Sequence, residues 1–468
     1  MIKKLKPALI LAGVALVLGI LLWVLVAFVL PKEEAGEEKG NEVVLMNTNL
    51  SEADSLEIKN SFDDYKLVKL AKDSYYIDGK KGYPVSGEYV VSLLDMIGEL
   101  KATKKVVANP SEEQLKEYGL AHPIGSFTVT NDADSYRFDL GITSASGNYY
   151  CRKSGDDAVY LIGTSIPDMV LLARYQFYSD SITSYSDAVS EQGGLTAMEL
   201  EGKNRKEAIA VKINDDLAED EVGTSYIMTA PIRHSLANSA TDNLVGLLSA
   251  LSTSSIVGDN TEEGALKKFG LDDPAATFSA VINGKKEVFY FGDISDAGMQ
   301  YCYRKGGKFV HAVDQAESAI LEASLVDFCE NMIYTRSADA LSRIDISGDG
   351  KNYTIKIGDK DDEGNMDVTI NHRKVESESF SDFYMHILNI GITGMDEEPQ
   401  GEDPYVRVEF TVKETGKVET MEFYPIDDLK CFCALNGGGR FVVDTMQVDL
   451  ILENAQHLYD GETIELEW

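Results

Sequence analysis

The chain has 468 residues, of which 78 are acidic and 43 are basic, giving a formal net charge of −35 at pH 7. A surface this acidic repels nucleic acid and anionic lipid headgroups, so neither is expected as a partner. Because 44% of the residues are hydrophobic, the chain is expected to fold rather than remain disordered. The charge is expected to serve solubility, and loose binding of divalent cations is the alternative.

An uncharged stretch, Ala8 to Leu30, lies near the N-terminus. It is long enough to cross a hydrocarbon core of about 30 Å as a helix, and it is longer than the apolar core of a cleaved signal peptide. Three lysines precede it and four glutamates follow it, so the positive-inside bias predicts a cytoplasmic N-terminus. We therefore expect residues 1–30 to form a cytoplasmic stub and a single-pass anchor in the cell membrane, with residues 31–468 outside. A cleaved signal peptide is the alternative.

The first external unit is predicted to combine strands and helices. Residues 31–50 are polar and Glu-rich, which favours an acidic tether, and residues 51–190 contain alternating apolar runs that predict antiparallel strands with one buried face. An apolar stripe at helical spacing predicts a helix that begins near Ser86. A short helix is expected between the N-cap Asn109 and Gly119, because glycine suits the left-handed position that ends a helix.

Part of this unit recurs further along the chain. The segment Asn109–Leu120 returns as Asn260–Leu271, 151 residues later, and matches at the same offset continue as far as Cys151 and Cys302. Self-similarity at a fixed spacing indicates an internal duplication. A feature that both copies share is then expected to be structural rather than catalytic.

The rest of the chain completes the predicted organisation. Residues 195–336 form a second unit, the first two units are each expected to end in a helix (residues 166–178 and 316–331), and residues 340–468 form a degenerate third unit without the duplicated short helix. The predicted fold class is therefore α+β. It comprises an N-terminal transmembrane helix followed by two clear and one degenerate α+β repeat units, with small antiparallel sheets covered by helices.

Two loops carry weak ligand signals. The segment Asp359–Gly364 resembles the start of a calcium loop, but Ile370 occupies the position of the final glutamate and strand-like segments flank the loop. An acidic hairpin turn is therefore expected there. The segment Gly437–Arg440 lacks the ending and the following helix of a phosphate loop, so it is expected to form a turn between two strands.

Titratable residues predict no active site. Asp382 and His386 lie four apart on one face of a predicted helix, which favours a surface pair, since a catalytic pair would need a nucleophile or metal beside it. The six histidines are scattered, and the fingerprints of serine hydrolases, zinc proteases and dinucleotide-binding enzymes are missing from the sequence. We therefore predict no catalytic, cofactor-binding or metal-binding residues and no enzymatic activity. A hydrolase whose site is assembled between units is the enzymatic alternative.

Basic pairs recur in the two copies. Arg152-Lys153 and Arg304-Lys305 end the tyrosine-rich strands of both units. Ordinary hairpin charges are expected, and reception of an acidic partner segment is the alternative.

The five cysteines do not predict a disulfide framework. Cys151 and Cys302 are repeat equivalents in separate units, so a bond between them is not expected. Cys431 and Cys433 lie two apart in a predicted strand, which places both side chains on one side of it. A zinc site would need two more ligands, and the sequence offers no second pair with suitable spacing.

The duplicated motif resembles a known family. It reads Glu117-Tyr118-Gly119-Leu120-x-x-Pro123 in the first copy and Lys268-Phe269-Gly270-Leu271-Asp272-Asp273-Pro274 in the second. Together with Tyr149-Tyr150, Val159–Ile162 and the lysine-rich N-terminus, it resembles the bacterial family known as domain of unknown function 4340. The resemblance covers residues 55–335 well and 340–468 weakly. It implies auxiliary proteins encoded beside ABC-type export systems, including those associated with gliding motility, and it carries over no catalytic residues.

The anchor, the repeats and the resemblance together predict a function. The chain is expected to be a non-enzymatic, membrane-anchored extracytoplasmic repeat protein that serves as an auxiliary or scaffold component of an ABC-type transport system. Its expected partners are the bacterial cytoplasmic membrane and membrane proteins of an ABC-type exporter, with no nucleic acid and no cofactor. Because the chain has 23 tyrosines, an extracytoplasmic ligand- or cell-wall-glycan-binding module is the alternative.

Overall fold

The protein's structure, a computed structural model, describes residues 42–182, 185, 187, 194–214, 225–249, 251, 255–260 and 264–464. The predicted anchor and residues 31–41 of the predicted tether lie outside this range. In the described part of the chain, no helix is long and apolar enough to cross a membrane. The chain divides into two compact units, Met1–Phe177 (unit 1) and Tyr178–Trp468 (unit 2).

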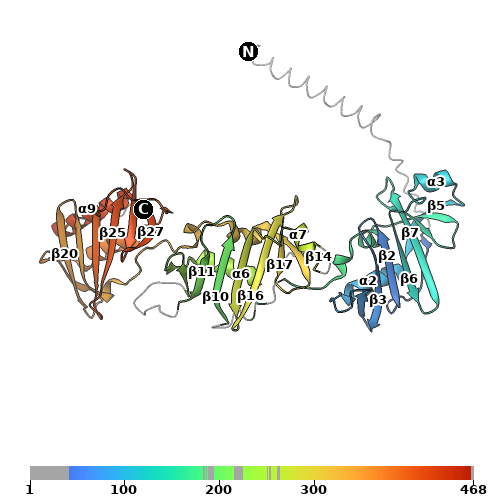
Figure 1. Ribbon diagram of the computed structural model, residues 1–468, viewed down its shortest axis with the longest axis horizontal. Helices are drawn as coiled ribbons and strands as arrows, with labels where there is room; N and C mark the ends of the chain where they lie inside the picture. The colour runs from blue at the N-terminus through green and yellow to red at the C-terminus, as the bar shows by residue number, and fades with distance from the viewer. Residues whose placement is uncertain are drawn as a thin grey trace, which may run out of the picture. The chain divides into compact units, whose positions relative to one another are not determined.

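The fold is α+β and contains three antiparallel sheets of nine strands each, so the sheets are larger than the small sheets predicted from the sequence (Figure 1). Sheet 1, in unit 1, has the spatial order β1 (Val43–Val44), β5 (Lys101–Ala108), β9 (Ala158–Ile162), β8 (Tyr149–Lys153), β7 (Asp134–Thr143), β6 (Gly125–Asn131), β2 (Ser55–Asn60), β3 (Asp64–Ala71) and β4 (Ser74–Ile77).

Unit 2 contains the other two sheets. Sheet 2 has the order β14 (Ser255–Asp259), β18 (Phe309–Asp314), β17 (Met299–Arg304), β16 (Lys285–Ile294), β15 (Ala276–Ile282), β10 (Leu195–Gly202), β11 (Ile209–Ile213), β12 (Tyr226–Ala230) and β13 (His234–Ser235). Sheet 3 has the order β23 (Gly394–Met395), β27 (Gly438–Asp444), β26 (Lys430–Leu435), β25 (Val418–Pro425), β24 (Val406–Val412), β19 (Leu341–Gly348), β20 (Lys351–Lys360), β21 (Met366–Ile370) and β22 (Arg373–Val375).

The three sheets share one path of the chain. In each, a meander (β2–β4, β10–β13 or β19–β22) leads into a helix, which crosses to the far side of the sheet and enters β5, β14 or β23. This strand is the sheet edge in sheets 2 and 3, whereas in sheet 1 the short strand β1 lies outside β5. A second meander of four strands then returns to the first strand of the sheet. Sheet 3 therefore has the same strand order as sheet 2, although the sequence motif is missing from it. Sheet 1 differs in having three strands instead of four in its first meander and in having β1 at its edge.

The register of the strands also agrees between the sheets. A cross-strand pair that contains a cysteine in sheet 1 recurs in sheet 2 with both residue numbers raised by 151. The equivalent pair in sheet 3 also contains a cysteine. Each of these three cysteines has no exposed surface. The equivalent cross-strand pairs are Leu140 with Cys151, Phe291 with Cys302, and Phe423 with Cys433.

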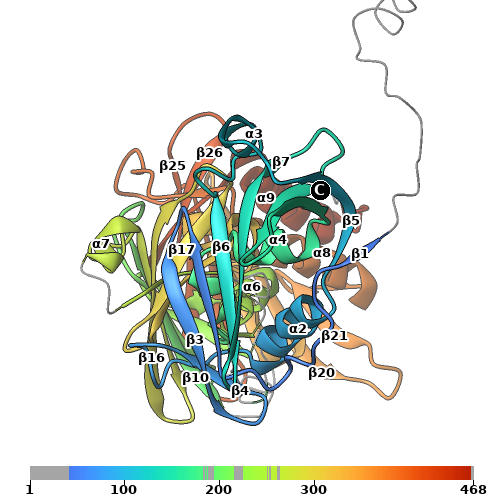
Figure 2. The same ribbon diagram turned by 90° about the vertical axis from the view of Figure 1, so that its right-hand side faces the viewer.

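The crossing helices are α2 (Gly87–Gly98), α6 (Asn238–Ser249) and α8 (Ser377–Leu388). Helix α2 begins where it was predicted to begin, and Ser86 caps it through its side chain, which accepts a hydrogen bond from the Tyr89 amide. The buried face of α2 consists of Val90, Leu93, Leu94 and Ile97. Figure 2 shows α2 beside α4 (Ser165–Val170) in unit 1, and β1 alongside β5.

The duplicated Tyr/Phe-Gly-Leu motif fastens a short helix to a strand. The helices are α3 (Glu112–Glu117) and α7 (Ala265–Lys268). In the first copy the Ile142 amide donates to the Tyr118 carbonyl at 3.0 Å, and in the second the Asp293 amide donates to the Phe269 carbonyl at 3.0 Å. The chain can turn back after each helix because the next residue is a glycine with positive φ, +73° in one copy and +68° in the other.

A second glycine allows the strand to approach this helix. A Cβ on Gly141 would lie 2.1 Å from the Tyr118 carbonyl oxygen, and a Cβ on Gly292 would lie 2.1 Å from the Phe269 carbonyl oxygen. No side chain fits at such a distance. The matching glycines at the 151-residue offset are thus explained by backbone contact.

Several predicted helix ends are wrong. The N-cap of α3 is Ser111, not Asn109, because Ser111 forms a capping box with Gln114. The closing helix predicted for residues 166–178 is divided into α4 and a 3₁₀ turn, η3 (Arg174–Phe177), and residues 316–331 contain 3₁₀ segments, η4 (Gln315–Glu322) and η5 (Val326–Phe328). A third 3₁₀ segment, η6 (Ala338–Ala340), leads into sheet 3.

One long helix was not predicted from the sequence. Helix α9 (Thr445–Asp460) closes sheet 3, with its buried residues at helical spacing and Gly461 at φ +77° as its C-cap. The helical spacing of its apolar residues could have predicted α9. The third unit, however, lacks the duplicated motif from which the other two units were aligned.

Substitution of Gly292 by alanine tests the role of the strand–helix contact. We expect Gly292→Ala to lower the free energy of unfolding by about 2–4 kcal/mol, because the added Cβ meets a backbone oxygen that cannot move without breaking the contact. Gly246→Ala on α6 is the matched control. It has no atom within 4 Å of the added Cβ and should stabilise by about 0.5–1 kcal/mol. If urea titration gave the same change in the free energy of unfolding for both variants, the role of Gly292 in the strand–helix contact would be contradicted.

Candidate functional site at the entry to sheet 3

A buried polar network of the third sheet forms where the chain enters that sheet. We call the residues that lead into each sheet its entry segment; for sheet 3 this is Ile333–Arg336. The segment lines a pocket of about 510 Å³ within unit 2, together with Glu419 of β25, His234 of β13 and Asn436 in the turn after β26.

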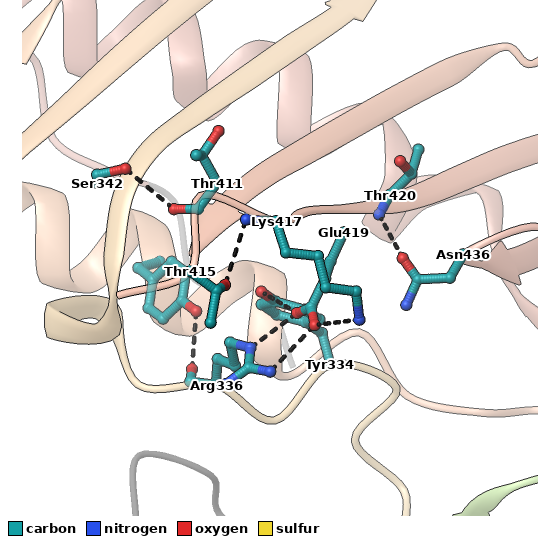
Figure 3. A network of polar contacts seen from close by, with 10 residues as sticks. Tyr334, Arg336, Ser342, Thr411, Thr415, Lys417, Glu419, Thr420 and Asn436 are labelled. Carbon is teal, nitrogen blue, oxygen red and sulfur yellow. Dashed lines mark hydrogen bonds and ion pairs between the residues drawn. The ribbon is translucent and has the colours of Figure 1, made fainter. Parts of the chain in front are cut away.

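Glu419 is the centre of the network, as Figure 3 shows. Arg336 binds its carboxylate through two hydrogen bonds, Nε to Oε2 at 2.8 Å and Nη2 to Oε1 at 3.0 Å. Tyr334 donates its hydroxyl to Oε2 at 3.1 Å, and Lys417 donates to Oε1 at 3.2 Å. Two cations and a phenol therefore share one carboxylate, whose side chain is 8% exposed.

Aromatic packing fixes the entry segment above the sheet. The Tyr334 ring is stacked on Phe410 of β24, with centroids 3.9 Å apart and an interplanar angle of 14°. Tyr384 of α8 donates its hydroxyl to the Arg336 carbonyl at 2.8 Å. The crossing helix and the sheet thus hold the same short segment from two directions.

The electrostatics follow from this geometry. Burial alone would raise the Glu419 pKa, but the hydrogen bonds from Arg336, Lys417 and Tyr334 outweigh it, and the pKa lies below its usual value. Burial raises the pKa of the Tyr334 and Tyr384 hydroxyls, so both stay protonated and act as donors. A carboxylate that already accepts four hydrogen bonds is poorly suited to act as a general base.

His234 forms another part of the pocket wall. Its Nε2 lies 2.7 Å from the Glu330 carbonyl oxygen, and its ring lies 4.8 Å from the Phe441 ring. Burial lowers the pKa of His234 more than the Glu330 carbonyl raises it. The neutral imidazole with Nε2 protonated is the form that suits this contact.

A related arrangement occurs in sheet 2, in which the arginine, Arg304, lies in β17 instead of the entry segment. Glu287 of β16 occupies the ladder position equivalent to Glu419, and it pairs with Lys285 at 2.6 Å as Glu419 pairs with Lys417. A tyrosine of the entry segment, Tyr185, hydrogen-bonds to Glu287 and accepts from Arg304 at 3.1 Å. We call this combination of Lys-x-Glu, tyrosine and arginine the entry clamp.

Sheet 1 uses a simpler version of the contact. Lys153, the equivalent of Arg304, donates to the Leu45 carbonyl at 2.7 Å and so holds the segment that leads into sheet 1. The two basic pairs predicted from the sequence are therefore not exact equivalents, because Lys153, the second residue of the first pair, corresponds to Arg304, the first residue of the second pair. Arg152 lies 3.7 Å from the exposed Asp157, which fits an ordinary hairpin charge.

The structure also places the other candidate residues. Asp382 is exposed, whereas His386 is 4% exposed and its Nε2 lies 3.0 Å from the Gln447 carbonyl oxygen of α9. The predicted surface pair is therefore wrong, because the helix turns His386 toward α9. Burial lowers the His386 pKa, partly offset by the Gln447 carbonyl.

Both candidate ligand loops lie at hairpin turns, as predicted. The Asp361 side chain accepts from the amides of Glu363 and Asn365 at 2.9 and 2.8 Å, between β20 and β21. Of the segment Gly437–Arg440, only Gly437 lies in the turn between β26 and β27, and the other three residues begin β27, where Arg440 pairs with Asp396 and, at 2.5 Å, with Glu207. Among the described residues, no group of three or more His, Cys, Asp or Glu is arranged to hold a metal ion.

The cysteines are buried free thiols. Cys431 and Cys433 lie in β26 and are 1% and 0% exposed, so they share one face of the strand as predicted. Burial raises the pKa of Cys329 to about 12, and it raises the pKa of Cys151 and Cys302 as well. Thiols in this state pack as small apolar side chains.

The sequence interpretation did not identify the entry clamp. Its glutamates follow lysine at the same ladder position, as Lys285-x-Glu287 and Lys417-x-Glu419, and this was a visible signal. Their tyrosine partners, Tyr185 and Tyr334, come from the entry segments, whose spacing from the strands differs between copies, and the arginine comes from β17 in sheet 2 but from the entry segment in sheet 3. Only the fold brings these parts together.

Replacement of Glu419 by glutamine tests the clamp through its pH dependence. At pH 7, Glu419→Gln should lower the free energy of unfolding by about 2 kcal/mol, because Arg336 and Lys417 lose their counter-charge. The folded-state Glu419 pKa is depressed, so its contribution is complete above the ordinary pKa of 4.5 and is lost as the pH falls through the folded value. The difference between variant and wild type should therefore shrink below about pH 4.5.

The matched control is Lys417→Met. Its lysine side chain is 63% exposed, so its loss should cost less than about 1 kcal/mol. Urea unfolding across the pH range measures both. A Glu419→Gln effect that did not change with pH would contradict the proposed ionised clamp.

Comparison with known proteins shows where the chain belongs. No curated protein matches it. The family described as "Domain of unknown function (DUF4340)" matches residues 76–265 and 227–405, which together make up more than half of the chain. The matched ranges contain both copies of the Tyr/Phe-Gly-Leu motif, and they confirm the resemblance predicted from it. The chain is a member of the DUF4340 family.

Proposed function

We propose that the protein is a non-enzymatic, membrane-anchored extracytoplasmic scaffold that serves as an auxiliary component of an ABC-type transport system. One structural observation supports this proposal most directly. Three sheets that share one path of the chain follow each other along the sequence, and a largely buried ion pair, Arg336 with Glu419, fastens the chain to sheet 3. Repeat architectures of this kind offer extended surfaces for binding other proteins.

The location proposed for this scaffold follows from the sequence. The uncharged span Ala8–Leu30 and its flanking charges favour an anchor with residues 31–468 outside the membrane. The segment 31–42 reaches at most about 40 Å when fully extended, so unit 1 would stay near the membrane surface. Membrane proteins are then the nearest partners.

Recovery of membrane partners tests this function. Affinity purification of the full chain from gently solubilised, cross-linked membranes should recover the membrane subunit of an ABC-type exporter. A variant without residues 8–30 is the control, and it should lose the partner because it is no longer held at the membrane. If the full chain recovers no exporter subunit and no transporter genes lie beside its own, the scaffold proposal fails.

A second candidate, a ligand- or cell-wall-glycan-binding module, is supported by the pocket of about 510 Å³. Its wall combines aromatic side chains, Tyr334 and Phe441, with the amide of Asn436, and such combinations are common in ligand pockets.

A thermal-shift screen with cell-wall glycan fragments distinguishes the two candidates. Only the binding module predicts that a glycan raises the unfolding temperature, and Thr335→Trp, which fills the pocket, should abolish the rise. Thr335→Ser is the control that leaves the pocket open. If no fragment raises the unfolding temperature, or if Thr335→Trp leaves a rise unchanged, this pocket is not a glycan site.

A further inference from the structure

A groove in unit 1 differs from the features that the copies share. It has a volume of about 1080 Å³ and lies between α2 and the segment Asn47–Ser51, with Asp73 at one end. Its volume is at the upper end of the range for small-molecule pockets, about 300–1,000 Å³, so a stretch of polypeptide would fit it.

Close backbone contacts shape the groove. The Thr48 amide donates to the Gly98 carbonyl at 2.9 Å, and a Cβ on Gly98 would lie 2.5 Å from the Thr48 carbonyl oxygen. A Cβ on Gly87 would lie 1.9 Å from the Asp73 carbonyl oxygen. Both ends of α2 are therefore held against the neighbouring chain by glycines, which fixes the walls of the groove.

The groove is acidic and lacks cations of its own. Four exposed carboxylates, Asp73, Glu88, Asp95 and Glu99, line it, and no lysine, arginine or histidine is among its lining residues. In the described part of the chain, none of the four forms an ion pair or a side-chain hydrogen bond. Nearby acidic residues differ, since Glu52 pairs with Lys69 at 2.5 Å.

Two of the carboxylates, Asp95 and Glu99, are not part of the shared scaffold. Aligning the buried pair Leu93-Leu94 of α2 with Leu247-Leu248 of α6 and Phe383-Tyr384 of α8 places Ser249 and Met385 at the position of Asp95. Asn389 follows α8 at the position of Glu99. Glu88 has acidic equivalents, Asp242 and Glu378, and the turn of Asp73 corresponds to the acidic turn after β20 in sheet 3. The acidic C-terminal half of α2 is therefore specific to the first copy, in contrast to the Tyr/Phe-Gly-Leu motif.

The chemistry of the groove selects its occupant. Among the described residues, which include those lining the groove, no group of three or more His, Cys, Asp or Glu is arranged to hold a metal ion. Val91 and Met96 add apolar surface between the carboxylates. Complementarity therefore requires positive charges spaced along a partly apolar chain, rather than a small cation.

We propose that the groove beside α2 is the docking site for a basic segment of a partner protein, in which lysine or arginine residues are interspersed with apolar ones. This site rests on the proposed scaffold function, because it supplies the surface at which that scaffold holds its partner. Lysine and arginine side chains bind the four carboxylates, and the apolar residues cover Val91 and Met96.

Binding of a labelled peptide tests the groove directly. The probe is a fluorescent peptide of about eight residues that alternates lysine and leucine, added to the full chain in detergent and followed by fluorescence anisotropy. The groove variant combines Asp73→Asn, Glu88→Gln, Asp95→Asn and Glu99→Gln. The control variant removes the same charge elsewhere, by combining Asp242→Asn, Glu378→Gln, Asp382→Asn and Glu453→Gln, all at exposed positions.

We expect the groove variant to weaken peptide binding by at least about tenfold, and the control variant by less than about twofold, since four exposed ion pairs contribute about 0.2–1 kcal/mol each. Ser92→Trp, which fills the groove without changing charge, should also abolish binding, whereas Ser92→Ala should not. Equal losses in both charge variants, or undiminished binding by Ser92→Trp, would overturn the proposal.

The experiments distinguish a failure of the groove proposal from a failure of the scaffold proposal. If the groove variant still recovers the exporter subunit from membranes at the wild-type level, the groove is not the docking site but the scaffold function stands. If the peptide binds in the groove and no membrane partner is recovered, the scaffold function fails while the groove remains a site for basic segments.

Discussion

A nine-stranded antiparallel sheet buries one face only if other parts of the chain cover it, and this requirement governs the whole protein. The crossing helix supplies part of the cover, and the entry segment supplies another part. The entry segment carries backbone carbonyls and polar side chains over an apolar surface, so these groups need partners there. Glu419, with Arg336, Lys417 and Tyr334, provides them in sheet 3, and Glu287 has the same place in sheet 2.

The duplication separates what holds the fold together from what varies on it. Buried cysteines at one ladder position, glycines at the strand–helix contact and the Lys-x-Glu clamp occur in more than one copy. Sheet 3 has lost the short helix yet keeps the strand order, so the sheet does not need that helix to form. Asp95 and Glu99 on α2 have no acidic equivalents among the described residues of α6 and α8, which is the pattern expected of a surface selected for a partner rather than for folding.

Local signals in the sequence predicted a large part of this architecture. The start of α2 near Ser86 and the helix end at Gly119 could be predicted because each depends on residues close in sequence, and the repeated cysteines could be predicted from the duplication. The clamp, by contrast, joins residues 83 positions apart, Arg336 and Glu419, through a path that only the fold defines. His386 was misplaced for a similar reason, because its partner lies on α9, a helix that the sequence interpretation missed.

The central claim is that the copies share a scaffold and that the partner binds where they differ. Photo-cross-linking in living cells from one equivalent position on each crossing helix tests it most directly. A compact diazirine residue of about the size of leucine, much smaller than the tryptophan that fills the groove, replaces Ser92 of α2, Gly246 of α6 or Asp382 of α8. We predict a specific adduct with a membrane protein from position 92 alone, formed through a basic segment of that partner. Adducts of equal yield from all three positions, or from α6 or α8 in place of α2, would contradict the account.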